Sequence, residues 1–282
     1  MTHLENTITS TTPWRLILSP PAPGDWNMAV DEALMESAVQ NGSPPTLRLF
    51  SWDPPCLSLG YAQSVTDVHE KSLAEFGWTL VRRPTGGRAI LHTDEITYSI
   101  TGRQDDPIFS GSILESYRRL AAALLSAIAC LGVTADLKEI KDRSPNNGVA
   151  DAVCFEVASN YEITCQGKKL IGSAQARRNQ GFLQHGSLPL FGNLDRINEV
   201  IRYPSLEERN MAKIRLREHA TTLETVMGYR VSWKSAADAF IAGFQETLGI
   251  EFERSKLSVK ETERVQQLNN EKYGNRDWNE RR

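Results

Sequence analysis

Hydrophobic and polar residues alternate with a period of two in several short runs of the first hundred residues. Leu47 and Leu49 are separated by one residue, which is the spacing of half-buried strands. Leu57 and Leu59 repeat this spacing. Neighbouring runs rich in β-branched and aromatic residues extend the pattern. We therefore predict five strands, over residues 46–52, 56–59, 78–83, 89–91 and 96–101.

Two stretches follow the 3.6-residue period of helices instead. One begins at Asp25, which we expect to be its N-cap, and stops at the turn-forming residues 41–45. The other opens at Ser112 with the spacing of a capping box and ends at Gly132. Its apolar face is expected to hold Ile113, Tyr117, Leu120, Leu124, Ile128 and Leu131.

A β-hairpin is predicted in the middle of the chain. Residues 161–165 and 168–171 flank Gln166 and Gly167, a two-residue connection of the kind that joins antiparallel strands. A further strand is expected over residues 182–190, after a polar turn.

Helical patterns dominate the last third of the chain. The pattern is helical and charged over residues 193–218, and residues 221–282 are expected to form a small α-rich unit. Its central helix, residues 234–248, places three apolar residues on one stripe, Phe240, Phe244 and Leu248. Because strands and helices are interspersed without a regular βα alternation, the order favours an α+β fold, with helices flanking a mixed, largely antiparallel sheet.

Length and charge exclude several classes of protein. A chain of 282 residues can bury a full core, so it needs neither disulfides nor metals to fold. The 32 Lys and Arg residues are outnumbered by 35 Asp and Glu residues, which argues against a nucleic-acid partner. The most apolar run, residues 120–133, is shorter than the ~20 residues that span a bilayer, so no membrane partner is expected either. No signal-peptide pattern precedes residue 14, which indicates a cytoplasmic protein.

The four cysteines form no CxxC pair, so no structural metal site is expected. Cys130 lies in an apolar helical pattern and Cys165 in a strand pattern, and we expect both to be buried and inert. Cys56 begins a strand after two prolines and stays ambiguous. Cys154 lies between a polar loop and a strand, where a thiol can be reached, so it is a candidate nucleophile, with an inert buried cysteine as the alternative.

The first candidate binding segment joins two predicted strands. Gly86 and Gly87 follow Arg82 and Arg83 and precede Arg88. Paired glycines let a backbone approach a ligand closely, and three arginines favour an anion. The segment matches neither a P-loop nor a GxGxxG motif, and a tight turn with exposed arginines is the alternative.

The second candidate segment covers residues 168–178. Gly172, Ser173 and Ala174 interrupt its strand-like pattern, which a substrate lying against the backbone would explain. A β-bulge with a solvated basic edge is the alternative. Residues 76–93 and 163–194 contain no acidic side chain, so they form a positive patch for an acidic partner if they converge.

Together these segments resemble the biotin/lipoate A/B protein ligase family, and most closely its octanoyltransferase branch. The resemblance runs from about residue 14 over nearly the whole chain. The matching motifs follow one another at residues 27–34, 81–92, 94–95, 97–99, 154–155, 159–162, 167–175, 184–187, 272–273 and 278–279.

The resemblance implies a catalytic domain over residues 41–250, with a helix-bearing segment over residues 1–40 and a helical extension over residues 251–282. It implies an acyltransferase without cofactor or metal. Its donor would be octanoyl-acyl carrier protein. Its acceptor would be one lysine of a lipoyl domain, in glycine cleavage H protein or a 2-oxoacid dehydrogenase E2.

The resemblance also assigns roles to residues. Cys154 would be the nucleophile, and Lys169 would support it. Exchange of one thioester for another stores the acyl group without ATP, and a nearby ammonium lowers the pKa of a thiol. The substrate-binding residues would be Arg83, Thr85, Gly86, Gly87, His92, Gly172, Ser173, Ala174 and His185.

Backbone amides at residues 86–87 or 172–173 are candidates for holding the oxyanion of the tetrahedral intermediate. Leu57, Leu59 and Ile90 are candidates for the wall of an acyl pocket.

Four alternatives remain open. Within the family, the chain could be an ATP-dependent lipoate ligase, or an amidotransferase that moves octanoyl groups between lipoyl domains. His92 or His185 could form a Cys–His dyad in place of the lysine. A non-catalytic module with an anion site at residues 83–88 is the reading from a different class.

Overall fold

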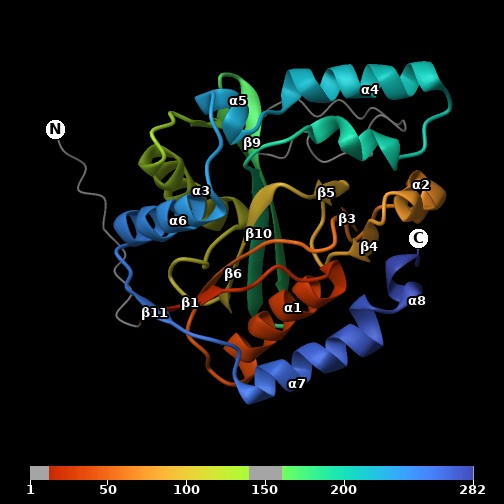
Figure 1. Ribbon diagram of the computed structural model, residues 1–282. Helices are drawn as coiled ribbons and strands as arrows, with labels where there is room; N and C mark the ends of the chain where they lie inside the picture. The colour runs from red at the N-terminus through yellow and green to blue at the C-terminus, as the bar shows by residue number, and fades with distance from the viewer. Residues whose placement is uncertain (1–12, 140–160, 282) are drawn as a thin grey trace.

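The computed structural model describes residues 13–139 and 161–281. Their largest element is an eight-stranded sheet in the order β11-β1-β2-β6-β10-β9-β8-β7 (Figure 1). β1 pairs in parallel with β2 and β11, and the other neighbours are antiparallel. The bounds are β1 (Trp14–Leu18), β2 (Thr46–Phe50), β6 (Glu95–Arg103), β7 (Asp136–Glu139), β8 (Tyr161–Cys165), β9 (Lys168–Arg178), β10 (Gly181–Pro189) and β11 (Phe252–Arg254).

A second, three-stranded sheet has the order β4-β3-β5. It consists of β3 (Cys56–Leu59), β4 (Thr79–Arg82) and β5 (Ile90–His92). Together the two sheets confirm the predicted α+β class with a mixed, largely antiparallel sheet.

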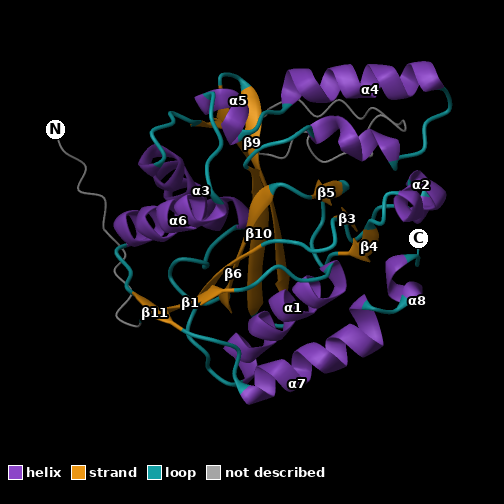
Figure 2. Ribbon diagram, in the orientation of Figure 1, coloured by secondary structure: helices purple, strands orange, loops and turns teal. Residues whose placement is uncertain are grey.

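Helices cover both faces of the large sheet (Figure 2). α3 (Ile113–Cys130) and α6 (Trp233–Leu248) pack together on one face, and α1 (Gly24–Gln40) and α7 (Val259–Leu268) lie on the other. The remaining α-helices are α2 (Glu70–Glu75), α4 (Leu206–His219), α5 (Leu223–Met227) and α8 (Arg276–Asn279). Short 3-10 segments are η1 (Val65–Asp67) and η3 (Leu194–Glu199), and η4 (Asn269–Tyr273) is a π-helical turn.

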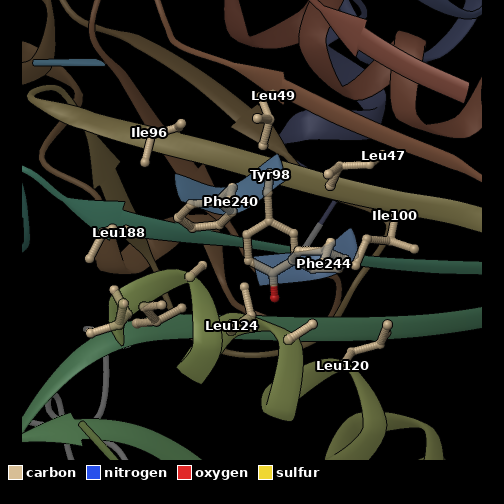
Figure 3. Close-up of a cluster of buried hydrophobic side chains, with 14 of the residues drawn as sticks. Leu47, Leu49, Ile96, Tyr98, Ile100, Leu120, Leu124, Leu188, Phe240 and Phe244 are labelled. Atoms are coloured by element: carbon tan, nitrogen blue, oxygen red, sulfur yellow. The ribbon is translucent and has the colours of Figure 1, made fainter. Parts of the chain in front are cut away.

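The alternation along β6 assigns its two sides. Ile96, Tyr98 and Ile100 face α3 and α6 and belong to the main apolar core. Figure 3 shows the Tyr98 ring among the leucines and phenylalanines of this core. The intervening Thr97 and Ser99 are buried on the opposite side, the side of α1. One side of the strand therefore builds the core, and the other is left for polar groups.

Local signals predicted most element boundaries. The capping box at Ser112 is present, with both of its hydrogen bonds to Glu115. Gln166 and Gly167 both have positive φ, as a tight hairpin requires. Phe240, Phe244 and Leu248 are buried, as the stripe on α6 predicts.

Other local predictions are wrong. Asp25 is not the N-cap of α1, because Pro23 precedes the helix and Asp25 lies in its first turn. Ile113 is 62% exposed, because it begins α3 at the end that extends past the core. Cys130 is exposed rather than buried, because two residues beyond Ile128 the helix presents its opposite side.

The small residues of the second candidate segment do not interrupt a strand. β9 runs continuously from Lys168 to Arg178, and Gly172–Ala174 pair with β10 in register. The pairing with β8 shifts register where Ile163 faces Ile171 and Thr164 faces Lys169, so Leu170 of β9 is an extra residue. A β-bulge is therefore present in this segment, but at Leu170 and not at the small residues.

The C-terminal residues return to the first elements of the chain. β11 extends the sheet beside β1, and α7 packs along α1. Arg15 of β1 forms an ion pair with Glu261 of α7 at 2.6 Å. Among the helices that the structure describes, none is long and apolar enough to cross a bilayer.

Gly243 offers a test of the packing between α3 and α6. A Cβ atom at this position would lie 2.3 Å from the backbone nitrogen of Ala127, which cannot rotate away. Helix propensity alone would make Gly243→Ala stabilising by ~1 kcal/mol. We expect the opposite, a loss of about 1–3 kcal/mol in the free energy of unfolding measured by urea denaturation. The exposed Gln245→Ala on the same helix is the control, and an equal effect of the two changes would contradict the prediction.

Candidate active site

A cavity of about 310 Å³ lies between the three-stranded sheet and strands β9 and β10. Met28, Trp52 and Ile90 give it an apolar wall. Its polar wall is contributed by Arg83 and Arg88 of the 83–88 loop and by polar side chains of β3, β5, β6, β9 and β10. The predicted site residues that line it are Arg83, Gly87, His92, Lys169, Gly172, Ser173, Ala174 and His185.

Two of the predicted binding residues lie beside the cavity rather than on its wall. Thr85 is buried and its hydroxyl bonds to His185 Nε2 at 2.6 Å. The Gly86 carbonyl accepts a hydrogen bond from Arg83, and Gly86 itself is exposed. Both residues therefore shape the loop around the cavity.

The prediction for the apolar wall is correct only for Ile90. Leu57 and Leu59 face the other side of β3, where they pack with Val68 and Leu73 in a separate apolar cluster. Ser58, the polar residue between them, faces the cavity. The alternation of Leu57 and Leu59 therefore predicts the strand correctly. The side of β3 that faces the cavity is the one that carries Ser58, not the one that carries the two leucines.

Lys169 is a buried cation of the cavity wall, as is Arg83. Its side chain is 3% exposed, and its ammonium lies 2.8 Å from the Glu162 carboxylate. Its backbone carbonyl accepts a hydrogen bond from Thr221, which fixes this end of β9. The neighbouring Lys168 points outward and bonds to the Arg217 carbonyl.

The arginines of the 82–88 segment build the loop instead of offering charge to solvent. Arg82 is fully buried, and its side chain donates to the carbonyls of Gly60, Gln63 and Asn279. The side-chain oxygen of Asn279 accepts from the Arg82 backbone at 2.7 Å. This clamp ties α8 to the two loops that flank the cavity mouth.

Arg83 holds the glycine turn from inside. It is 3% exposed and donates to the carbonyls of Gly86 and Arg88. Gly87 has φ of +92°, so the turn needs a glycine there. The alternative of a tight turn with exposed arginines is therefore wrong for Arg82 and Arg83. Both guanidiniums are buried and donate to backbone carbonyls.

The two acid-free segments do meet in space, where Arg178 donates to the Pro84 carbonyl at 2.9 Å. The expected positive patch is nevertheless much reduced. Lys169 is paired with Glu162, and Arg177 is bonded to backbone carbonyls at the start of α3. Most of these cations organise the site from within.

Sequence reasoning missed a buried polar network beneath the cavity. Asp31 of α1 bonds to Arg48 at 2.9 Å, to Ser99 at 2.7 Å and to His185 Nδ1 at 3.1 Å. Asp31 falls in the 27–34 motif, but nothing in that motif shows which partners its carboxylate meets.

Charge and burial oppose each other in this network. Burial by itself would raise the pKa of Asp31, but the hydrogen bond from His185 and the charge of Arg48 bring it below the ordinary value. Burial lowers the pKa of His185, against the opposing influence of Asp31. His185 is therefore held neutral, and its other nitrogen is available to Thr85.

The predicted nucleophile, Cys154, lies outside the described residues, as do Phe155 and Ser159. None of the three described cysteines lines the cavity. Burial raises the pKa of Cys56 to about 12, and Cys165 is buried in β8 with a raised pKa. Among the described residues, no group of three His, Cys, Asp or Glu side chains could hold a metal ion.

Three comparisons with known proteins agree. Residues 23–245 match the family model described as lipoyl protein ligase A/B catalytic domain. The chain is 40% identical over 266 residues to octanoyltransferase LipM of Carboxydothermus hydrogenoformans, with 94% of this chain and 97% of that protein covered. It is 39% identical to octanoyltransferase LipM of Symbiobacterium thermophilum, with 96% and 99% covered.

Solved structures share the fold. A bipartite lipoate protein ligase of Thermoplasma acidophilum, solved in a study with its E2 lipoyl domain, superposes with a TM-score of 0.79 at 26% identity. It covers 95% of this chain and 96% of its own. A lipoate-protein ligase A bound with ATP gives a TM-score of 0.77 at 27% identity, with 95% and 99% covered.

The neutral state of His185 predicts a loss of stability in acid. The unfolded chain takes up a proton on this histidine below pH ~6.5, whereas the folded chain does so only at lower pH. Stability is therefore fully present above pH ~6.5 and falls as the pH drops, by up to about 2 kcal/mol between pH 7 and pH 5. Asp31 adds a further loss only below pH ~3.9.

Urea denaturation at pH 7 and pH 5 measures this loss. The difference between the two pH values should shrink in His185→Gln. It should be unchanged in His219→Gln, because His219 is exposed and bonds only to a carbonyl of its own helix. An unchanged difference in His185→Gln would show that another group is responsible.

Proposed function

The chain belongs to the lipoyl protein ligase A/B catalytic-domain family, and we propose that it carries its acyl group as a thioester on Cys154 before transfer to a lipoyl domain. The protein is an octanoyltransferase of lipoate biosynthesis, the activity named for full-length relatives at 38–40% identity. The observation that carries the proposed mechanism is the buried ammonium of Lys169 on the wall of an apolar cavity.

The reaction divides into two steps. The Cys154 thiolate attacks the carbonyl carbon of an octanoyl thioester, the new C–S bond forms, and the donor thiol leaves with a proton. The lysine amine of the acceptor then attacks the enzyme thioester and forms an amide, and the Cys154 thiol is released. The first step is near thermoneutral and needs no ATP, because one thioester replaces another.

Lys169 is the group proposed to favour the thiolate. A positive charge close to a thiol lowers its pKa, because it stabilises the charged form. Burial strengthens this effect, since few water molecules screen the ammonium. Glu162 keeps the ammonium in place on the cavity side of β9.

The cavity is proposed to hold the octanoyl chain. Its volume falls at the lower end of the range for small-molecule sites, which suits one medium-length acyl chain. Met28, Trp52 and Ile90 supply apolar contacts. Gly172 and Ala174 have no bulky side chain, so the acyl chain can lie against the backbone of β9.

We propose octanoyl-acyl carrier protein as the donor, and a lipoyl domain of glycine cleavage H protein or of a 2-oxoacid dehydrogenase E2 as the acceptor. Support comes from the octanoyltransferase relatives and from the E2 lipoyl domain studied with the Thermoplasma ligase. A reducing cytoplasm is the compartment that fits, because it keeps the proposed thiol nucleophile reduced.

Intact mass spectrometry tests the thioester. The protein is mixed with octanoyl-acyl carrier protein without ATP and without an acceptor. We expect a mass gain of one octanoyl group, lost on treatment with hydroxylamine and absent in Cys154→Ala. Cys130→Ser is the control, because Cys130 is the exposed cysteine outside the cavity and should not affect the gain.

Absence of the mass gain would overturn the proposed mechanism. Labelling that appears only with ATP and free octanoate would indicate a ligase. Labelling from an octanoylated lipoyl domain but not from the carrier protein would indicate an amidotransferase.

Alkylation with iodoacetamide tests the role of Lys169. In a Cys130→Ser background, Cys154 should react well below pH 8, while the buried Cys56 and Cys165 stay unreactive. Lys169→Met should move the midpoint of the alkylation pH profile upward by about 1–2 pH units. Lys168→Met is the matched control, because its ammonium bonds to the Arg217 carbonyl and leaves the profile unchanged. Equal profiles for both variants would remove Lys169 from the mechanism.

A further inference from the structure

A second set of reactive groups lines the same cavity. Ser58 Oγ lies 2.8 Å from His92 Nε2, and His92 Nδ1 lies 2.6 Å from a Glu95 carboxylate oxygen. A hydroxyl bonded to one imidazole nitrogen, with a carboxylate on the other, is the arrangement by which a base activates an oxygen nucleophile. Ser58 and His92 both line the cavity, and all three residues are buried.

The hydrogen bonds around Glu95 orient the array. The Trp52 indole nitrogen can only donate, and it lies 2.8 Å from Thr97 Oγ1. Thr97 in turn donates to the Glu95 oxygen at 2.5 Å, the same oxygen that faces His92. Glu95 thus accepts from both sides, so His92 carries a proton on Nδ1. Stacking of the Trp52 ring on the imidazole, with centroids 3.9 Å apart, fixes the ring plane.

At the other end, Arg83 gives the serine a cationic neighbour. Its Nη1 donates to Ser58 Oγ at 3.1 Å and to the Ser58 carbonyl at 2.9 Å. Because the guanidinium only donates, the Ser58 proton can be directed to His92 Nε2, the ring nitrogen opposite the one that faces Glu95. The same guanidinium stabilises negative charge that develops beside Oγ.

A similar set, Thr85, His185 and Asp31, lies nearby but is arranged differently. Asp31 is neutralised by Arg48 at 2.9 Å, and Thr85 does not line the cavity. Of these two sets, the Ser58 array combines contact with the cavity, a base and an orienting carboxylate.

We propose that Ser58, His92 and Glu95 form a second acyl-accepting centre, which takes acyl groups from activated esters as an oxygen ester and releases them to water. The length of the acyl chain in this proposal rests on the proposed function, but the chemistry of the centre does not. The protein would thereby have a hydrolase activity that is independent of Cys154.

Atoms and charges balance in this reaction with water as the one co-reactant. Ser58 Oγ attacks the ester carbonyl carbon and its proton passes to His92 Nε2. His92 gives that proton to the leaving-group oxygen as the C–O bond breaks, so the alcohol or phenol departs and the imidazole is neutral again. His92 then takes a proton from water, whose oxygen attacks the Ser58 ester. The carboxylic acid leaves, and the proton returns to Ser58. Glu95 holds the imidazolium during both transfers.

The experiment uses full-length Cys154→Ala protein and para-nitrophenyl octanoate. We expect release of para-nitrophenolate above the buffer rate. In a second sample, the protein is treated with a fluorophosphonate, which reacts with activated serines. We expect peptide mapping to assign the octanoyl adduct of the first sample or the phosphonyl adduct of the second to Ser58. Ser58→Ala should abolish the adduct, and Glu95→Gln should slow hydrolysis by about 100-fold. Ser126→Ala is the control, because this half-buried serine lies on α3, does not line the cavity and bonds to Glu246.

The adduct is mapped on the Cys154→Ala protein, which retains Ser58, so this part of the test does not depend on whether the Ser58 and Glu95 variants fold. An adduct on Thr85, hydrolysis without an adduct on Ser58, or no reaction at all would each overturn the proposal. The result is also separate from the proposed function. A Cys154 thioester in the wild-type protein without a Ser58 ester in Cys154→Ala would reject only the second centre.

Discussion

The buried ion pair between Asp31 and Arg48 is the interaction on which the rest of the architecture depends. It joins α1 to β2, and through Ser99 and His185 it also fixes β6 and β10. Removing one partner of such a pair strands a charge in a site without water, at a cost of about 3–5 kcal/mol. The polar side of the sheet is therefore set by one carboxylate, while the apolar core lies on the opposite side.

This division explains why the cavity has both an apolar wall and polar side chains. The strands that pass the Asp31 network present glycine, serine and alanine to the cavity on β9, with His185 and Gly186 on β10. Bulky side chains of the same strands point into the core between α3 and α6. Lys169 is the exception among these small residues. Its ion pair with Glu162 makes that exception tolerable, because a buried ammonium needs a partner.

Elements set by neighbouring residues were predictable from the sequence, and contacts between distant segments were not. The capping box at Ser112 and the Gln166–Gly167 turn depend on a few adjacent residues, so their patterns were sufficient. Arg82 was expected to favour an anionic ligand, with exposure at a tight turn as the alternative, yet it is buried and bonded to Asn279, 197 residues further along the chain. Ser58 was overlooked for a similar reason, because alternation identifies a strand but does not say which side meets a cavity.

The contact between Arg82 and Asn279 also has a consequence for synthesis of the protein. The loops at the cavity mouth are held by a residue of α8, so they cannot reach their final arrangement until Asn279 has left the ribosome exit tunnel. Nascent chains that already contain both sheets would still lack the Arg82–Asn279 contact that holds these loops.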